Sequence, residues 1–212
     1  MSLFDLLFLV LMATVIITVG RVLYLSIRGR FRPAGKALIR LLLFVVLYIL
    51  VLVGFSMAQP QTQVPIGVPQ CFDDWCITVQ QAARQDAIGT TRAGGTFWIV
   101  TVSVSSRAKG RPQRETDVRV YLTDDGGRRF DVSAAGHRAL EGQGLAGLPL
   151  TTFVAPSSSF ESRLVFDVPK DARHLNLVKT SWSWVPFRLI IADPQSWLHR
   201  PTVVPLDLPL PK

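Results

Sequence analysis

The sequence contains few of the residues from which metal and redox sites are built. Among its 212 residues are only two cysteines and three histidines. A structural zinc site needs four such ligands, and the histidines are isolated in the sequence, with no His-x-x-x-His pair. These shortages exclude the common zinc motifs, and we expect neither a metal nor any other cofactor.

Motifs for catalysis are also missing. There is no Gly-x-Ser-x-Gly elbow and no glycine-rich phosphate loop after a strand. Two aspartate pairs, Asp73 with Asp74 and Asp124 with Asp125, could supply oxygen ligands to calcium or groups for acid–base chemistry. They lack the Asp-x-Asp-x-Asp-Gly spacing of a calcium loop and are typical of turns. We expect no enzymatic activity, and only a cluster of all four in one cleft would favour an enzyme.

Charge is scarce in the first 58 residues, where two long apolar runs lie. Leu6 to Gly20 has no charged residue in 15 positions, and Leu41 to Ala58 has none in 18. With their apolar flanks they predict helical spans over about residues 3–25 and 38–58, long enough for the ~30 Å hydrocarbon core. This pattern excludes both a wholly soluble protein and a multi-pass transporter.

Acidic residues are absent from the segment that joins the two runs. By the positive-inside rule this basic segment lies in the cytoplasm, facing anionic lipid headgroups. Both termini then lie outside, which predicts a two-pass protein of the cell (inner) membrane with a periplasmic or extracellular C-terminal domain. The basic residues are Arg21, Arg28, Arg30, Arg32, Lys36 and Arg40.

The net charge of +8 arises mainly from this segment, because the first 58 residues contribute +5. The rest of the chain has no concentrated basic patch with interleaved aromatic residues, as a nucleic-acid site would require. The expected partners are therefore the lipid bilayer and an envelope protein or polymer, and not nucleic acid. One alternative stays open: Ser56-Met57-Ala58 has the small-x-small pattern of a signal-peptidase site, so the chain could be cleaved after Ala58.

Proline marks the two ends of the outer part. Residues 59–70 contain three prolines and no charge, which predicts an extended linker. Residues 201–212 contain four prolines, which predict a tail or an edge segment. Between them, residues 71–200 predict an antiparallel, immunoglobulin-like β-sandwich after the two-helix transmembrane hairpin, with an irregular loop over 136–150. The expected strands cover about 76–82, 96–105, 118–123, 128–132, 160–168, 175–184 and 187–191.

Three segments carry a family resemblance. They are the strand Phe97–Val104, the hairpin Val120–Phe130 with its Asp-Asp-Gly-Gly turn, and Phe166–Ala172, which reads Phe-x-Val-Pro-x-x-Ala. Over residues 71–192 the chain resembles the telokin-like, immunoglobulin-like extracellular domains of bacterial lipoproteins and secreted immunoprotective antigens. The resemblance implies a β-sandwich exposed on a bacterial cell envelope. It implies no catalytic residue, and this chain has two spans where that family has a lipidated or cleaved N-terminus.

The two cysteines predict a disulfide. Cys71 and Cys76 lie on the oxidising side of the membrane in the expected topology. Four residues separate them, whereas a redox motif has two. We expect a small loop that fixes the first strand of the sandwich to the linker.

Tryptophan supplies the candidate binding surface. Trp182 and Trp184 are two residues apart, so on a strand both side chains point to one face. Facing inward they would belong to the core; facing outward they would form, with Trp75, an aromatic surface for a sugar or protein partner. The sequence thus favours non-enzymatic recognition or assembly at the bacterial envelope. The alternative is an accessory or sensory subunit of a larger membrane complex, docked through its helical hairpin.

Overall fold

The computed structural model describes residues 3–72, 74–180, 189–191, 196 and 198–206. Its contacts divide the chain into two compact units. A helical unit comprises residues 1–60 and 183–200, and a sandwich unit comprises residues 61–182 and 201–212.

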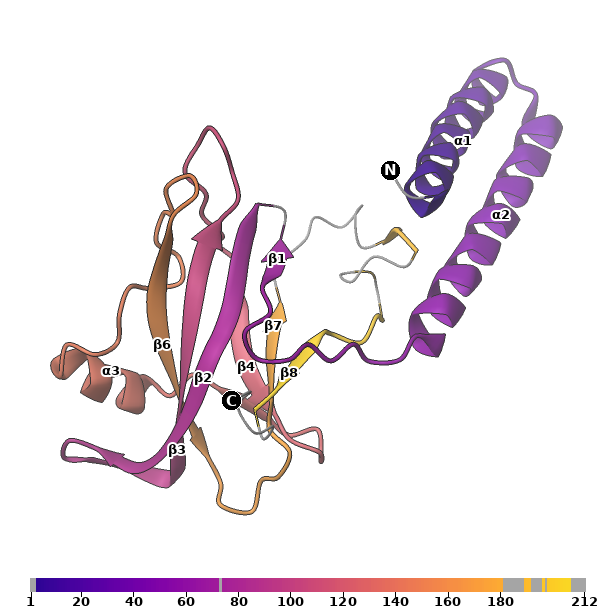
Figure 1. Ribbon diagram of the computed structural model, residues 1–212. Helices are drawn as coiled ribbons and strands as arrows, with labels where there is room; N and C mark the ends of the chain where they lie inside the picture. The colour runs from indigo at the N-terminus through magenta and orange to yellow at the C-terminus, as the bar shows by residue number, and fades with distance from the viewer. Residues whose placement is uncertain (1–2, 73, 181–188, 192–195, 197, 207–212) are drawn as a thin grey trace. The chain divides into compact units, whose positions relative to one another are not determined.

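The helical unit is built on an antiparallel hairpin of α1 (Leu3–Ile27) and α2 (Phe31–Ala58) (Figure 1). Gly29, with a φ of +71°, makes the turn between them, a conformation that suits a residue without a Cβ atom. Both helices are long and apolar enough to cross a membrane. Most of their large apolar side chains are exposed on the hairpin surface, as is expected of helices that face lipid.

The sandwich unit consists of two antiparallel four-stranded sheets. This confirms the predicted sandwich and the helices before it. One sheet has the order β1-β2-β3-β6 and the other the order β5-β4-β7-β8. The strands are β1 (Gln70–Phe72), β2 (Trp75–Ile88), β3 (Thr91–Ser106), β4 (Arg119–Thr123), β5 (Arg129–Asp131), β6 (Ser159–Val168), β7 (Asn176–Thr180) and β8 (Val203–Pro205).

Alternating residues of the long strand β3 form both cores of the sandwich unit. Val100, Val102 and Val104 are fully buried between the two sheets. Phe97 and Ile99 point to the other face of the first sheet and form a second cluster with Leu140 and Val165. Every second residue thus faces the same core, as the pleat of a strand requires.

The second cluster is covered by α3 (Ala134–Gly142), which lies in the region expected to be an irregular loop. That expectation was wrong. Ser133 caps the helix by accepting a hydrogen bond from the Gly136 amide, and Leu140 is buried against the sheet. Nine residues are too few for a stable isolated helix, so packing on the sheet stabilises α3.

Gly136 is the residue that lets α3 approach the sheet. A Cβ atom at this position would lie 2.5 Å from Val165 Cγ1 and 3.0 Å from Phe97 Cε1. We expect Gly136→Ala to lower the free energy of unfolding by about 1–3 kcal/mol, as overpacked cores do. Gly142→Ala is the matched control, because nothing lies within 4 Å of its Cβ position. Denaturant unfolding of both variants checks this, and equal effects would contradict it.

The linker and part of the C-terminal proline-rich stretch pair with each other at the sandwich, the latter as the edge segment that the sequence predicted. The linker lies along the sandwich, because the Val64 amide donates to the Val203 carbonyl at 2.9 Å and the Val203 amide donates to the Thr62 carbonyl at 3.0 Å. Val203–Pro205 form β8 at the edge of the second sheet, where a proline needs no ladder partner. A strand had been expected to include residues 189–191. These residues are not in a strand, and they pack in the helical unit.

Candidate functional site

Of the three tryptophans of the candidate binding surface, Trp75 is buried. Its side chain is 3% exposed and packs between the sheets, with its ring centroid 6.4 Å from that of Phe72. Trp75 is therefore not part of an exposed aromatic surface, because the start of β2 turns the indole inward. Trp182 and Trp184 lie outside the described residues, so their part of the surface stays a prediction.

The other predicted groups are found in the two units. The Cys71–Cys76 disulfide is present and links neighbouring positions of β1 and β2, which confirms that prediction. The basic residues are all exposed. They lie at the end of the hairpin where α1 meets α2, at Arg21, Arg28, Arg30, Arg32, Lys36 and Arg40.

The acidic residues do not form a metal site in the described part of the chain. No group of three His, Cys, Asp or Glu side chains lies close enough there to hold an ion. Asp124 instead binds Arg128, and Asp73 lies outside the described residues. The alternative of a calcium or acid–base cluster gains no support from these positions.

Sequence reasoning missed a cleft of about 380 Å³ in the sandwich unit. It lies at one end of the main core, where the β6–β7 loop (residues 169–175) meets β2 and β3. Trp98 and Leu175, both nearly buried members of that core, line it. The Arg84 guanidinium carbon lies 4.1 Å from the centroid of the Trp98 ring, a cation–π geometry.

The lining of this cleft is basic. Arg84, Lys170, Arg173 and His174 line it, and none of the described lining residues has a carboxylate. None of the ion pairs between described residues involves Lys170 or Arg173. We call this site the basic cleft. Lys170 and Arg173, together with the Arg84 guanidinium stacked on Trp98, place positive charge beside an apolar aromatic surface. This combination suits an anionic ligand with a nonpolar face.

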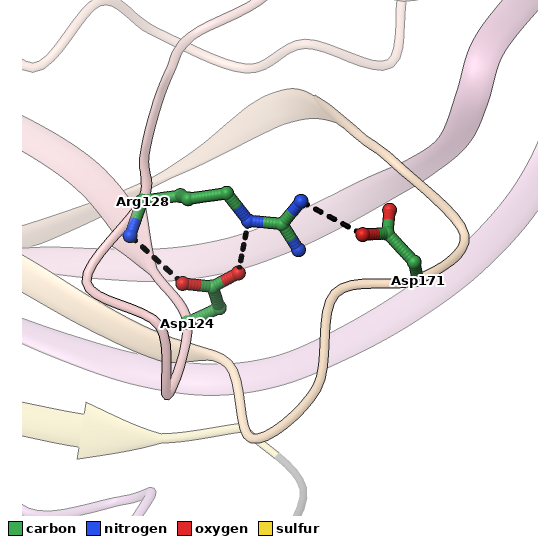
Figure 2. A network of polar contacts seen from close by, with 3 residues as sticks. All are labelled: Asp124, Arg128 and Asp171. Atoms are coloured by element: carbon green, nitrogen blue, oxygen red, sulfur yellow. Dashed lines mark hydrogen bonds and ion pairs between the residues drawn. The ribbon is translucent and has the colours of Figure 1, made fainter.

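A three-residue network fixes the β6–β7 loop, which carries Lys170 and Arg173 (Figure 2). Arg128 Nε donates to Asp124 Oδ2 at 2.7 Å, and Arg128 Nη1 donates to Asp171 Oδ2 at 2.8 Å. The Asp125 amide also donates to the Arg173 carbonyl at 3.2 Å. The β4–β5 turn therefore holds the β6–β7 loop at both Asp171 and Arg173.

The network also lowers the pKa values of its two carboxyl groups, Asp124 and Asp171. Burial opposes ionisation of Asp124, but hydrogen bonds from Arg128 outweigh it and lower the pKa of this carboxyl. The Arg128 hydrogen bond is the main reason that the pKa of Asp171 is lowered too. Asp171, the one acidic residue of the loop, is thus ionised and paired with Arg128. None of the ion pairs between described residues joins Asp171 to Lys170 or Arg173.

A second feature missed from the sequence is a buried lysine in β7. The Lys179 side chain is 9% exposed, and its Nζ has no hydrogen-bond partner among the described residues. The ammonium lies 4.1 Å from the centroid of the Phe72 ring. Burial lowers the pKa of Lys179 to about 7. The sequence held a signal for this, because Leu175, Leu177 and Lys179 alternate and so share one strand face.

Comparison with known proteins gives a likeness of fold alone. No protein-family model matches the chain, and no curated protein does. The secreted protein MPT63 of Mycobacterium tuberculosis is 13% identical, with a TM-score of 0.43 over 58% of this chain and 92% of that one. An uncharacterized β-sandwich protein of Clostridium difficile 630 is 12% identical, with a TM-score of 0.43 over 70% and 96%. A lipoprotein-like protein of Staphylococcus aureus is 6% identical, with a TM-score of 0.37 over 57% and 84%.

Proposed function

We propose that this protein is a membrane-anchored recognition module of the bacterial cell envelope. Its sandwich binds an anionic group of an envelope polymer in the basic cleft. The observation that carries the proposal is the described lining of that cleft, in which Arg84, Lys170 and Arg173 lie around Trp98 and no described residue adds a carboxylate.

The expected ligand follows from the geometry of the lining. A guanidinium presents a planar fork of donors that matches carboxylate and phosphate oxygens. Arg84 is already stacked on Trp98, so little side-chain freedom is lost when it binds. A nonpolar sugar face would contact Trp98 and Leu175, while a uronate or phosphate group would contact the cations. The volume of about 380 Å³ accommodates a small segment of such a polymer.

Binding without catalysis is the function that these groups support. The lining offers the Thr96 hydroxyl and the His174 ring as its other polar side chains. The lining residues that the structure describes include no acid to orient a histidine or to act as a general base beside a hydroxyl, as a nucleophilic triad would require. The protein is accordingly proposed to be non-enzymatic.

The anchor is proposed to be a two-pass hairpin in the inner membrane, with both termini outside. Two helices of sufficient length and apolarity support it, and the six basic residues gather at the end of the hairpin that joins them. A disulfide in the sandwich unit suits the oxidising side of the membrane.

Charge removal in the cleft tests the proposed binding. The full chain, in nanodiscs of zwitterionic phosphatidylcholine, is titrated with a polyuronate, a polyphosphate and neutral dextran. We expect the anionic polymers alone to bind, and Lys170→Gln/Arg173→Gln to weaken the affinity roughly 10–100-fold, because each charge-assisted hydrogen bond contributes about 1.5 kcal/mol.

A matched control separates the site from general charge effects. Lys109→Gln/Arg111→Gln removes the same charge from exposed positions outside the cleft. We expect it to change the affinity less than threefold at physiological salt, because distant exposed charges are screened. Equal losses in the two double variants would contradict a specific cleft, and equal binding of dextran would contradict anion recognition.

A further inference from the structure

Residues far from the hairpin in sequence are part of the helical unit. The Tyr48 hydroxyl of α2 donates to the Leu189 carbonyl at 2.6 Å. The hydroxyls of Ser56 and Ser196 are 3.2 Å apart. Ile191 is 2% exposed and belongs to one apolar cluster with Leu11, Tyr48 and Leu52. Leu189 and Ser196 therefore contact α2, and Ile191 packs with residues of both helices.

These contacts are spaced along α2, starting near its C-terminal end at Ala58. A helix rises 1.5 Å per residue, so Ser56 lies roughly 3 Å and Tyr48 roughly 15 Å along the axis from Ala58. Phe4 and Phe55, with ring centroids 5.4 Å apart, pair the two helices near the same end. The contact at Ser196 is thus near the end of α2, and the contact at Leu189 is about half the thickness of a hydrocarbon core away from it.

The burial and hydrogen bonds of the described residues are compatible with a position inside the hydrocarbon core. Non-helical backbone is tolerated in a membrane only where protein buries it and its polar groups are satisfied. Ile190, Ile191 and Ser196 are all buried by the protein itself, at 9%, 2% and 5% exposure. The Leu189 carbonyl accepts the Tyr48 hydroxyl and the Ser196 hydroxyl meets that of Ser56. In sequence, residues 181–200 contain three tryptophans, the residue type enriched where membranes meet water.

We propose that the stretch around residues 189–191 and Ser196, called the clasp, is re-entrant: these described residues lie on the hairpin within the outer leaflet of the bilayer. The inference rests on the proposed membrane insertion of α1 and α2. It gives the chain a second membrane contact, separated from the hairpin by the whole of β1 to β7. It also explains why Tyr48 and Leu52 on the hairpin are buried: the protein's own chain covers them at Ile191.

Cysteine cross-linking tests the contact itself. In native membranes, Ser56→Cys/Ser196→Cys should form a disulfide in most chains after mild oxidation, shown by peptide mapping that keeps the Cys71–Cys76 pair apart. Ser26→Cys/Ser196→Cys is the matched control, because Ser26 lies at the opposite end of the hairpin, near the turn at Gly29. We expect at least a tenfold lower yield for it. Similar yields from the two pairs would overturn the clasp.

Spin labels test its location. Nitroxides are attached in nanodiscs at Leu198, at Leu43 of α2 and at Phe153 of the sandwich unit, which are 53%, 66% and 63% exposed. The ratio of collision rates with oxygen and with a water-soluble nickel chelate reports depth. We expect a high ratio at Leu43, a low one at Phe153 and a several-fold higher one at Leu198 than at Phe153.

The outcomes separate the two proposals. A high ratio at Leu43 with equal ratios at Leu198 and Phe153 would overturn the clasp and leave the anchor intact. A low ratio at Leu43 would overturn the membrane insertion and, with it, the lipid location of the clasp. The cross-link would then report only a contact between Ser196 and α2.

Discussion

Replacing Lys179 by methionine is expected to stabilise the protein by about 4 kcal/mol at pH 7. Lys179 is buried, its Nζ has no hydrogen-bond partner in the described part of the chain, and its pKa falls to about 7. The pKa of an unfolded lysine is about 10.4, and each unit of difference is worth about 1.4 kcal/mol. Methionine has similar length and no charge, so it fills the same space between the sheets without this cost.

The stabilisation by Lys179→Met should decrease as the pH rises above 7. Between about pH 7 and pH 10.4 the unfolded chain binds more protons at Lys179 than the folded chain does. Stability of the wild-type protein therefore rises with pH in this window, and the cost of the lysine is largest at and below pH 7. The advantage of Lys179→Met should shrink towards zero near pH 10.

Unfolding of the full chain in detergent micelles, followed by tryptophan fluorescence at pH 7 and pH 10, measures this difference. Lys109→Met is the control, because Lys109 is exposed and its removal should change stability by less than about 0.5 kcal/mol. A gain of the same size at both pH values, or a loss of stability in Lys179→Met, would contradict a costly buried ammonium.

Local patterns in the sequence predicted most of the elements and few of the contacts between them. The alternation of Val100, Val102 and Val104 and the apolar run of α2 are local signals, and both elements formed as expected. The helix α3 was missed because its stability comes from contact with Phe97 and Val165, which are distant in the sequence.

The basic cleft could not be predicted for the same reason. It brings together Arg84, Trp98 and the loop around Arg173, and the β2–β3 register that pairs Arg84 with Trp98 follows from the whole sheet. The apolar residues Leu189 to Ile191 suggested a strand, because a short apolar run suits a buried strand and a helix-packing segment equally well. Only the partner surface decides between these two structures.

Replacing Arg128 by methionine is expected to reverse the acid dependence of stability. In the wild-type protein the pKa values of Asp124 and Asp171 are lowered by Arg128. Carboxyls of this kind stabilise the fold above their unfolded pKa of about 3.9, and that stability is lost as the pH falls through their folded pKa values. Wild-type stability should thus be steady from pH 7 to pH 5 and fall below pH 4.

Without Arg128, the Asp124 carboxylate stays nearly inaccessible, at 1% exposure of its side chain, and loses its charged partner. Two amide hydrogen bonds to Asp124 remain, from residues 126 and 128. We expect burial, the largest single influence on this carboxyl, to outweigh them and to raise the pKa of Asp124 above its unfolded value. The variant should melt several degrees below wild type at pH 7, because a nearly inaccessible carboxylate has lost its half-exposed charged partner. Its melting temperature should rise as the pH falls from 7 to 5, because the folded state now takes up the proton.

The double variant Arg128→Met/Asp124→Asn identifies the group responsible. It removes the titrating carboxyl and should be more stable at pH 7 than Arg128→Met alone, with no rise between pH 7 and pH 5. The same variants report on the cleft, because Arg128 holds Asp171 in the β6–β7 loop. If Arg128 positions that loop, binding of the anionic polymer should weaken in both variants, including the double variant in which stability has recovered. A melting temperature of Arg128→Met that falls with pH as in the wild type would show that Asp124 is not controlled by this contact.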